Sequence, residues 1–377
     1  MDNMSMIEER IPASSPPFWA DKTVVVAGAT GFLGGWLVRR LLEYDAKVVT
    51  LVRDPDKLSH IVMESLLNRT TVERGSVDDE RFLEQVFTRH EIDVFFHAAY
   101  GADVNRVLLE PLECFRSSAL STWIILDLIR RRQPSCVAVV SSSDKAYGSQ
   151  PLPYRESRAL TPVHPYEVAK ASQDLAAQSF GRVYGVPVAV TRCGNYFGPY
   201  DFNFTRLIPG VCKSLASGET PRLRSDGRFT RDFLYIEDAV DVQLLLAERL
   251  AVDQSLYGEA FNFSYGEQLE VFEIVRRLMA LAGVDGLPIV EDTVRAEIRH
   301  MHLSSEKAGK RLRWSPRVGF DEGLKRTVDW YLSFLGADQS DQPTPITLDE
   351  ATSSALPFTY QALFAMTGAL PVTSLLG

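Results

Sequence analysis

Short apolar runs rich in valine alternate with longer amphipathic stretches over the first half of the chain. The runs have the length and β-branched composition of buried strands, whereas apolar residues in the longer stretches recur at the spacing of a helix face. The predicted strands are Val24–Ala27, Val48–Val52, Val94–His97, Val137–Ser141 and Val188–Thr191. The predicted helices include Trp36–Tyr44, Arg81–Arg89 and Ser121–Arg131. Strands that alternate with helices predict an α/β fold, in which crossover helices cover both faces of a doubly wound parallel sheet.

The pattern changes after residue 193. Segments punctuated by proline, glycine and arginine follow, together with predicted helices at Val240–Leu250 and Val271–Ala282. From residue 336 the sequence GADQSDQPTP has the composition of a linker. We therefore expect four parts. They are an N-terminal extension (1–20), a sheet domain (21–193) to which segments near 236–264 return, a smaller C-terminal domain (194–335) and an appendage (336–377).

Composition indicates a folded protein and excludes some classes of function. The chain has 377 residues, of which 45% are hydrophobic and 24% are charged, as in ordinary globular proteins. A net charge of −9 argues against general affinity for nucleic acid or for an anionic membrane, because such partners need basic surface. The N-terminus lacks the basic start and the apolar run of a secretory signal. We therefore expect a cytoplasmic protein.

Cysteine spacing and the C-terminal segment support that expectation. The four cysteines are far apart and form no C-x-x-C pair, which disfavours a metal site and a disulfide framework. They are Cys114, Cys136, Cys193 and Cys212. Residues 358–376 are uncharged, but Gln, Thr, Gly and Pro interrupt the segment, so we expect a tail or a docking segment and no membrane span.

Three glycines, Gly28, Gly31 and Gly34, form a G-x-x-G-x-x-G motif between the first strand and its helix. Without side chains there, backbone N–H groups and a helix N-terminus can approach a pyrophosphate. A plain turn is the alternative. The position at the first strand–helix junction of an alternating α/β chain favours a dinucleotide site in a Rossmann sheet.

The end of the second predicted strand bears on the choice of cofactor. An acidic residue there would bind the adenosine ribose of NAD, yet Arg53 follows Val52. A guanidinium group suits a 2′-phosphate, which would favour NADP. A solvated Arg53 beside Asp54 and Asp56 is the alternative, so NAD and NADP both stay open.

Tyr166 and Lys170 have the spacing Y-x-x-x-K, which places both side chains on one face of a helix. A tyrosine with an ordinary pKa of about 10 is a poor base at neutral pH, and a neighbouring ammonium group favours its phenolate. The spacing alone is weak, since such pairs occur by chance on exposed helices. Upstream, polar residues 141–145 follow a predicted strand, at the sheet edge where α/β folds place their sites. Asp144 and Lys145 can supply an acid and a base there, and a surface ion pair is the alternative.

These motifs together resemble those of the extended short-chain dehydrogenases/reductases, the NAD-dependent epimerase/dehydratase family. The matching residues occur in the family's order over residues 18–335. They are the glycine loop, His97-Ala98-Ala99, Ser142-Ser143, Tyr166-x-x-x-Lys170, Arg192-Cys193-Gly194-Asn195-Tyr196-Phe197-Gly198-Pro199 and Arg231-Asp232-Phe233. Within the family the chain is most similar to CDP-glucose 4,6-dehydratases, at Phe18-Trp19, Gly34-Gly35-Trp36-Leu37 and Ser143-Asp144-Lys145. The Asp-Lys pair is the most telling, because epimerases usually have no acid/base pair there and most other sugar-nucleotide dehydratases have Asp-Glu.

The resemblance implies roles for individual residues. Ser143, Tyr166 and Lys170 would oxidise the substrate, and Asp144 and Lys145 would remove water from it. The C-terminal domain would bind the substrate through Asn195, Arg231 and Arg299. The cofactor would contact Gly28, Thr30, Gly31, Phe32, Leu33, Gly34, Arg53, Ser76, Val77, Ala98, Ala99, Tyr166 and Lys170.

The chain departs from the family pattern at three places. Ser76 stands where an adenine-binding Asp is usual, and Ser118 stands where an Asn is usual. Residues 231–235 resemble the general family pattern more than that of the CDP-glucose enzymes. The nucleotide of the substrate therefore stays open.

The resemblance implies a sugar-nucleotide 4,6-dehydratase with bound NAD, or NADP because of Arg53. Hydride removal at C4, loss of water across C5 and C6, and return of hydride to C6 would give a 4-keto-6-deoxy sugar. An epimerase of the same fold would use Tyr166 and Lys170 without water loss, and a binding module would keep the fold without catalysis. Product mass separates the first two, and absence of turnover marks the third. The resemblance also implies a homodimer that pairs through two helices, one of which carries the Y-x-x-x-K residues.

Overall fold

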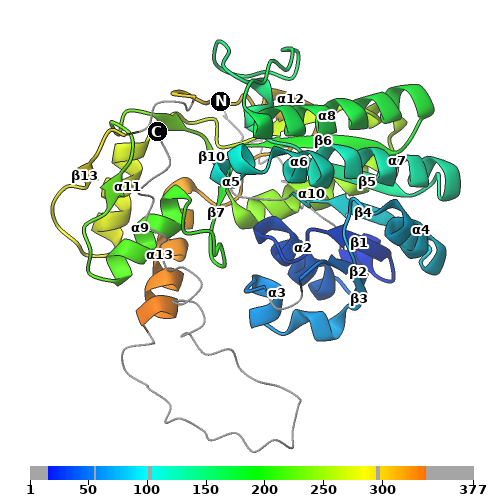
Figure 1. The fold of residues 1–377 in the computed structure, drawn as a ribbon, viewed down its shortest axis with the longest axis horizontal. Coiled ribbons are helices and arrows are strands. Elements are labelled where there is room, and N and C mark those ends of the chain that lie inside the picture. Colours follow the sequence, from blue (N-terminus) through cyan, green and yellow to red (C-terminus); the bar gives the residue numbers. More distant parts are fainter. Residues whose placement is uncertain (1–15, 55–56, 101–103, 294–297, 337–377) are drawn as a thin grey trace, which may run out of the picture.

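A computed structural model describes residues 16–54, 57–100, 104–293 and 298–336. Its centre is a seven-stranded parallel sheet in the order β3–β2–β1–β4–β5–β6–β11 (Figure 1). The strands are β1 (Thr23–Ala27), β2 (Lys47–Val52), β3 (Thr71–Arg74), β4 (Val94–His97), β5 (Val137–Ser141), β6 (Val188–Cys193) and β11 (Ala260–Phe263). The chain runs outward from β1 to β3 and then returns to β4 beside β1, so the order reverses between these two central strands. That reversal is where a doubly wound sheet opens a crevice for a ligand, and it confirms the predicted fold.

Helices cover both faces of the sheet. The helices are α1 (Pro16–Trp19), α2 (Phe32–Glu43), α3 (His60–Met63), η1 (Leu66–Arg69), α4 (Glu80–Arg89), α5 (Val104–Leu109), α6 (Pro111–Phe115), η2 (Arg116–Leu120), α7 (Ser121–Arg132), η3 (Asp144–Tyr147), α8 (Pro165–Tyr184), α9 (Leu207–Ala216), α10 (Ile236–Leu250), η4 (Gln254–Leu256), α11 (Val271–Leu281), α12 (Glu306–Leu312) and α13 (Phe320–Gly336). Alternation along β1 shows the two layers: Val24 and Val26 join one core with α2 and α10, whereas Val25 and Ala27 join another with α4, α7 and α8. Strands buried on both faces explain why the sequence shows continuous apolar runs rather than alternation.

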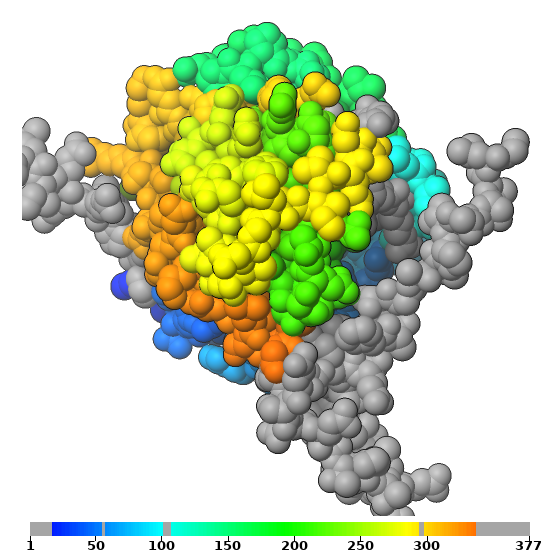
Figure 2. Space-filling model, turned by 90° about the vertical axis from the view of Figure 1, so that its left-hand side faces the viewer, coloured from blue at the N-terminus to red at the C-terminus, as the bar shows by residue number. Residues whose placement is uncertain are grey.

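Short strands and helices after β6 form a second region at one end of the sheet. The strands are β7 (Asn195–Phe197), β8 (Arg222–Leu223), β9 (Thr230–Arg231), β10 (Phe233–Tyr235), β12 (Leu269–Glu270) and β13 (Ile289–Val290). They form three two-stranded sheets, β10–β7, β12–β9 and β13–β8. Helices α9, α11 and α13 pack against one another there, and Figure 2 shows their green, yellow and orange atoms covering that end of the molecule.

Residues 236–264 pack with the sheet rather than with this second region. Helix α10 lies against β5, β6 and α2, and β11 pairs in parallel with β6. Helix α2 begins at Phe32, four residues before the predicted start, because the last glycines of the loop lie in its first turn. Strands β3 and β11 have no counterpart among the predicted strands.

Several expectations concern the ends of the chain. The segment 358–376 and most of the N-terminal extension lie outside the described residues. Where the structure is described, no helix is long and apolar enough to cross a membrane. The part of the extension that is described contains α1, whose Trp19 is fully buried and donates a 2.7 Å hydrogen bond from Nε1 to Glu248.

Candidate functional site

The glycine loop is packed so tightly that side chains are excluded from it. Gly28 has φ +87°, and a Cβ atom there would lie 2.7 Å from the backbone of Ala98 and Ala99 at the end of β4. A Cβ atom on Gly34 would lie 2.0 Å from the Gly28 carbonyl oxygen. Gly31 precedes α2, and its N–H donates to the same carbonyl at 2.9 Å. The loop thus presents backbone and a helix N-terminus at the reversal point between β1 and β4, which is the arrangement that fits a dinucleotide pyrophosphate.

The remaining expected cofactor residues lie at the ends of β2 and β3. Arg53 has a side chain that is 63% exposed, and its guanidinium pairs with Glu113 of α6 at 3.1 Å. Ser76 donates from Oγ to Asp78, and Val77 packs against the second core. Arg53 is therefore largely solvated and also pairs with Glu113, and an ion pair this exposed contributes little to stability.

Helix α8 carries the Y-x-x-x-K pair and begins at a defined cap. The His164 ring accepts from the Tyr166 backbone N–H at 3.2 Å, and Glu167 accepts from the His164 N–H at 3.3 Å. This reciprocal cap fixes the first turn of the helix. Tyr166 and Lys170 are 8% and 4% exposed, so both side chains face the protein interior, as the spacing predicts.

Lys170 is bound to the end of β5. Its Nζ donates to the Ser141 carbonyl at 2.7 Å and to Gln173 at 3.0 Å, and Ser142 Oγ donates to the Lys170 carbonyl at 3.3 Å. Burial lowers the pKa of Lys170 to about 8. The ammonium group also lies 5.2 Å from the centre of the Tyr100 ring, and cations are attracted to aromatic faces at such distances.

Tyr166 differs from the expectation in one physical respect. Burial raises the pKa of its hydroxyl well above the ordinary value, while a hydrogen bond with Ser143 acts in the opposite direction. The sequence suggested that the Lys170 ammonium would favour the phenolate, whereas desolvation has the largest influence on this hydroxyl in the structure. The Tyr100 ring stands edge-on to Tyr166, with centroids 5.6 Å apart.

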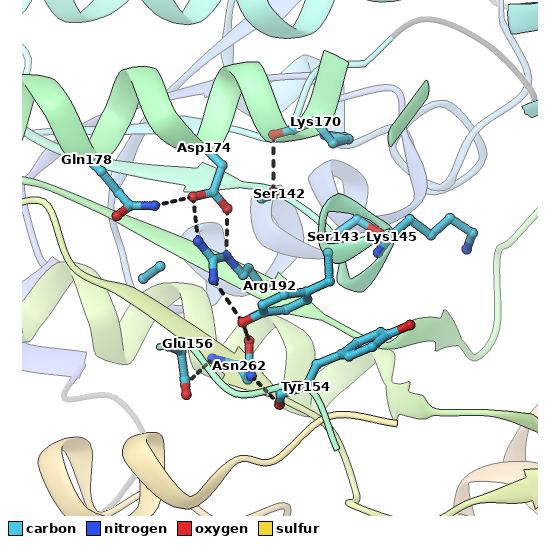
Figure 3. Close-up of polar contacts among 12 residues, drawn as sticks. Ser142, Ser143, Lys145, Tyr154, Glu156, Lys170, Asp174, Gln178, Arg192 and Asn262 are labelled. Atoms are coloured by element: carbon cyan, nitrogen blue, oxygen red, sulfur yellow. Dashed lines mark hydrogen bonds and ion pairs between the residues drawn. The ribbon is translucent and has the colours of Figure 1, made fainter. Parts of the chain in front are cut away.

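Ser143, Asp144 and Lys145 lie where β5 runs into η3. Ser143 caps this turn, accepting from the Lys145 N–H at 3.2 Å and donating to Asp144 Oδ1 at 2.8 Å. Asp144 is 1% exposed, and its Oδ2 has no hydrogen-bond partner within the described residues. Lys145 extends away from the buried network in Figure 3 and donates to Asn195 Oδ1 at 3.3 Å. The structure thus brings the two predicted acid/base residues and one predicted substrate residue together.

A buried polar network that the sequence analysis did not identify supports this turn (Figure 3). Arg192 of β6 donates to both carboxylate oxygens of Asp174 on α8, at 2.7 and 2.8 Å, and to the Tyr147 hydroxyl at 2.8 Å. Tyr147 closes η3 and donates to Asn262 of β11 at 2.8 Å. The network therefore links the helix that carries Tyr166 to the turn that begins at Asp144.

The predicted substrate residues belong to the second region, with Asn195 in β7, Arg231 in β9 and Arg299 bonded through its carbonyl to the Thr230 N–H. Asn195 donates to the Asp232 carbonyl at 3.2 Å. Beyond Asp232, the guanidinium groups of Arg231 and Arg299 lie 5.4 and 5.6 Å from the same Phe229 ring, so two cationic groups meet there. The sequence analysis gave no role to Asp232, whose pKa is raised to about 7 by burial.

The predicted cofactor residues and the predicted catalytic residues meet at the carboxyl ends of the central strands. Gly28, Ala98 and Ser143 follow β1, β4 and β5, which are neighbours in the sheet order. Tyr166 lies in the first turn of α8, which packs against β5. Comparison with known proteins gives this arrangement its family. Residues 24–263 match the model of the NAD dependent epimerase/dehydratase family. The chain belongs to this family.

Two relatives that match most of this chain are named as dehydratases of the family. A dTDP-glucose 4,6-dehydratase of Streptomyces antibioticus is 31% identical over 320 residues, covering 82% of this chain and 92% of that protein. The dTDP-glucose 4,6-dehydratase 1 of Escherichia coli K12 is 28% identical over 345 residues, with the same coverage. The resemblance to the family is thus confirmed, while the nucleotide in these relatives' names is thymidine rather than the cytidine of the sequence analysis.

Solved structures of family members have the same fold. DesIV, a dTDP-glucose 4,6-dehydratase of Streptomyces venezuelae solved with NAD and TYD bound, superposes with a TM-score of 0.74 at 27% identity, covering 84% of this chain and 98% of that one. A UDP-glucose 4-epimerase of Thermotoga maritima, solved with UDP-glucose, gives 0.74 at 25% identity, covering 83% and 99%. Both dehydratases and epimerases of the family therefore share this architecture.

Proposed function

We propose that the protein is a sugar-nucleotide 4,6-dehydratase that converts a nucleoside-diphosphate hexose to the 4-keto-6-deoxy sugar, with NAD as its cofactor. The observation that carries the proposal is the meeting of Asp144 and Lys145 with Ser143 and Tyr166 at the end of β5. Oxidation needs only a proton acceptor beside the cofactor, whereas elimination of water needs an acid and a base in addition. The dehydratase names of the relatives support the same reaction.

The tight loop at Gly28, Gly31 and Gly34 would hold the cofactor's pyrophosphate, and Ala98 and Ala99 would line the adjoining wall. Bound NAD would supply reversible acceptance of a hydride. Tyr166 would take the proton of the C4 hydroxyl, with Ser143 holding that oxygen. Because burial favours the protonated form of Tyr166, positive charge close to the hydroxyl would have to offset the burial before the phenol can act as a base.

Elimination follows at the same turn. A carbonyl at C4 acidifies the hydrogen at C5, and Lys145 would take that proton. Asp144 would give a proton to the C6 hydroxyl, so that the C5–H and C6–O bonds break, a C5–C6 double bond forms and water leaves. Return of the hydride to C6, with Lys145 giving its proton back to C5, would then complete the 4-keto-6-deoxy sugar. Asn195 would hold Lys145 toward the sugar, and Arg231 with Arg299 would bind the diphosphate.

The test is the mass of the product. We expect the purified protein to lower the mass of one of CDP-, GDP-, UDP- or dTDP-glucose by one water. In Asp144→Asn, hydride removal should survive while water loss stalls, so that absorbance of the reduced cofactor accumulates. Asp329→Asn, at an exposed ion pair on α13, is the matched control and should behave as the wild type. A wild-type protein that returns a product of unchanged mass would support an epimerase instead, as in the Thermotoga maritima neighbour, and full dehydration by Asp144→Asn would remove this residue from the mechanism.

We further propose a homodimer that pairs through α7 and α8. Apolar side chains project from the outer surface of these neighbouring helices, with Trp123, Leu175 and Tyr184 each about half exposed. Scattered apolar residues are ordinary on a surface, but a contiguous set marks an interface. Light scattering should give twice the chain mass for the wild type and the mass of a single chain for Leu175→Glu. Leu287→Glu, similarly exposed but before β13, should leave the dimer intact, and a wild-type monomer would overturn the proposal.

The division into a cofactor-binding part and a substrate-binding part belongs to the same proposal, with the boundary near residue 193. A cytoplasmic location fits the four cysteines, which are free and buried. The choice of nucleotide base, and of NAD over NADP, is decided by the product screen and by cofactor titration.

A further inference from the structure

Strand β7 contributes three side chains with three different environments. Asn195 bonds Lys145 and the Asp232 carbonyl, and Phe197 packs in the core against Phe233 and Tyr235. Tyr196, between them, has a buried hydroxyl for which the described residues offer no hydrogen-bond partner. A buried hydroxyl without a partner is costly and uncommon, and therefore requires an explanation.

The surroundings of Tyr196 locate that hydroxyl at the site. Burial raises the pKa of Tyr196 well above its ordinary value, and the neighbouring Cys193, Tyr166 and Asp144 act in the same direction. A thiol forms only weak hydrogen bonds, so Cys193 does not satisfy the phenol. The phenol consequently keeps its proton at neutral pH, and it can donate a hydrogen bond but cannot serve as a base.

A second polar atom without a partner lies in the same place. Asp144 Oδ2 is buried and unpaired within the described residues, while Oδ1 accepts from Ser143. Two polar groups, a phenol hydroxyl and a carboxyl oxygen, are thus left without partners beside the Y-x-x-x-K tyrosine. A sugar hydroxyl both donates and accepts hydrogen bonds, so the hydroxyls of a bound hexose would satisfy both groups.

We propose that Tyr196 is a substrate-binding residue whose hydroxyl donates to the hexose hydroxyl that Asp144 protonates. The inference rests on the proposed dehydratase function and adds a residue to that site. During elimination the C5 proton goes to Lys145, the proton of Asp144 goes to the departing oxygen, and Tyr196 keeps its own proton. Its hydrogen bond holds the leaving oxygen against the Asp144 carboxyl and strengthens as charge develops on that oxygen.

The test is Tyr196→Phe, which removes one oxygen atom and keeps the ring. Because that oxygen has no partner, the melting temperature should stay level or rise. Affinity for dTDP-glucose should fall about tenfold while affinity for dTDP stays unchanged, as expected for one hydrogen bond to the sugar. CDP-glucose and CDP serve as a second pair of probes. The kcat for water loss should fall by about tenfold or more, with reduced cofactor accumulating before elimination.

Tyr265→Phe is the matched control. Its hydroxyl donates to the Val318 carbonyl at 2.8 Å, away from the site, so this variant should melt earlier and keep the wild-type kcat. The role of Tyr196 is overturned if Tyr196→Phe binds and turns over dTDP-glucose and CDP-glucose like the wild type, or if it loses stability as Tyr265→Phe does. A wild-type protein that dehydrates no nucleoside-diphosphate hexose removes the proposed function, and with it this role, whereas an active wild type with an unaffected Tyr196→Phe removes the role alone.

Discussion

Replacing Asp174 by alanine should destabilise the protein strongly, because it leaves a buried charge without its counter-ion. Asp174 and Arg192 are 0% and 2% exposed. Burial opposes the charge on Arg192, but the Asp174 carboxylate more than offsets it, and the pKa of the guanidinium is raised above its ordinary value. In Asp174→Ala the guanidinium stays charged and retains the Tyr147 hydroxyl as its acceptor.

The magnitude follows from the hydrogen bonds that the substitution removes. Two charge-assisted bonds to Arg192 disappear, at 2.7 and 2.8 Å, together with the 2.6 Å bond from Gln178. Removing one partner of a buried ion pair costs about 3 to 5 kcal/mol. At roughly 2 to 4 °C per kcal/mol, this loss corresponds to a fall in melting temperature of about 6 to 20 °C. We expect a value in the lower half of that range, because the melting temperature of a longer chain shifts less per kcal/mol. Dehydration should slow as well, since the same network supports the turn at Asp144.

Thermal unfolding followed by circular dichroism measures the effect, with urea unfolding as a second assay. The decisive comparison is the double variant Asp174→Ala/Arg192→Met. If the cost comes from an uncompensated buried charge, removing the charge as well should recover part of the lost stability. A double variant less stable than Asp174→Ala alone would refute the reasoning and would assign the cost to packing.

Three further predictions concern acid stability, the glycine loop and the cofactor. Burial, followed by the nearby Lys170, lowers the pKa of His97 to about 3, below its unfolded value, so its contribution is present above pH 6.5 and is lost as the pH falls toward 3. Between pH 6.5 and pH 4, the free energy of unfolding of His97→Gln should therefore fall by roughly 3 kcal/mol less than that of the wild type. Equal losses of unfolding free energy in the two proteins would contradict this. Gly34→Ala places a Cβ atom 2.0 Å from the Gly28 carbonyl oxygen and should abolish NAD binding in calorimetry. Gly309→Ala, whose Cβ atom would lie at an ordinary contact distance of 3.7 Å from the Trp314 carbonyl oxygen, should not. Arg53→Ala should lower affinity for NADP about tenfold and leave affinity for NAD nearly unchanged, because only a 2′-phosphate gains a bidentate partner from Arg53; equal losses for both would show that it does not discriminate.

The sequence predicted the central strands because they are buried on both faces and read as valine-rich runs. It did not predict β3 at the sheet edge, because three of the four residues of its sequence TVER are polar. It also did not predict β11, which pairs with β6 some seventy residues away in sequence. Neither has a local signal that separates it from a loop. Pairing over such a distance depends on the tertiary structure, which no window of sequence contains.

The residues of the site likewise divide into those that the sequence predicted and those that it did not. Residues close in sequence, such as those from Ser143 to Lys145, or four apart on a helix, such as Tyr166 and Lys170, could be grouped from spacing alone. The partners that set the chemistry of these residues could not be predicted from spacing. Tyr100 reaches Lys170 from the end of β4, and Arg192 reaches Asp174 from β6. A buried arginine inside a strand was the one available signal, since a guanidinium enters a core only with a partner.

Burial gives the proposed reaction an order. The same desolvation that keeps the Tyr166 phenol protonated also lowers the pKa of Lys170 to about 8, so burial opposes the charged form of both groups. A phenol that cannot ionise cannot take a proton from a sugar, whatever the geometry. In the proposed mechanism, positive charge on the bound cofactor would change that balance beside the group that accepts the hydride. We therefore expect oxidation to depend on an occupied cofactor site, because the charge that makes Tyr166 a base would arrive together with the hydride acceptor.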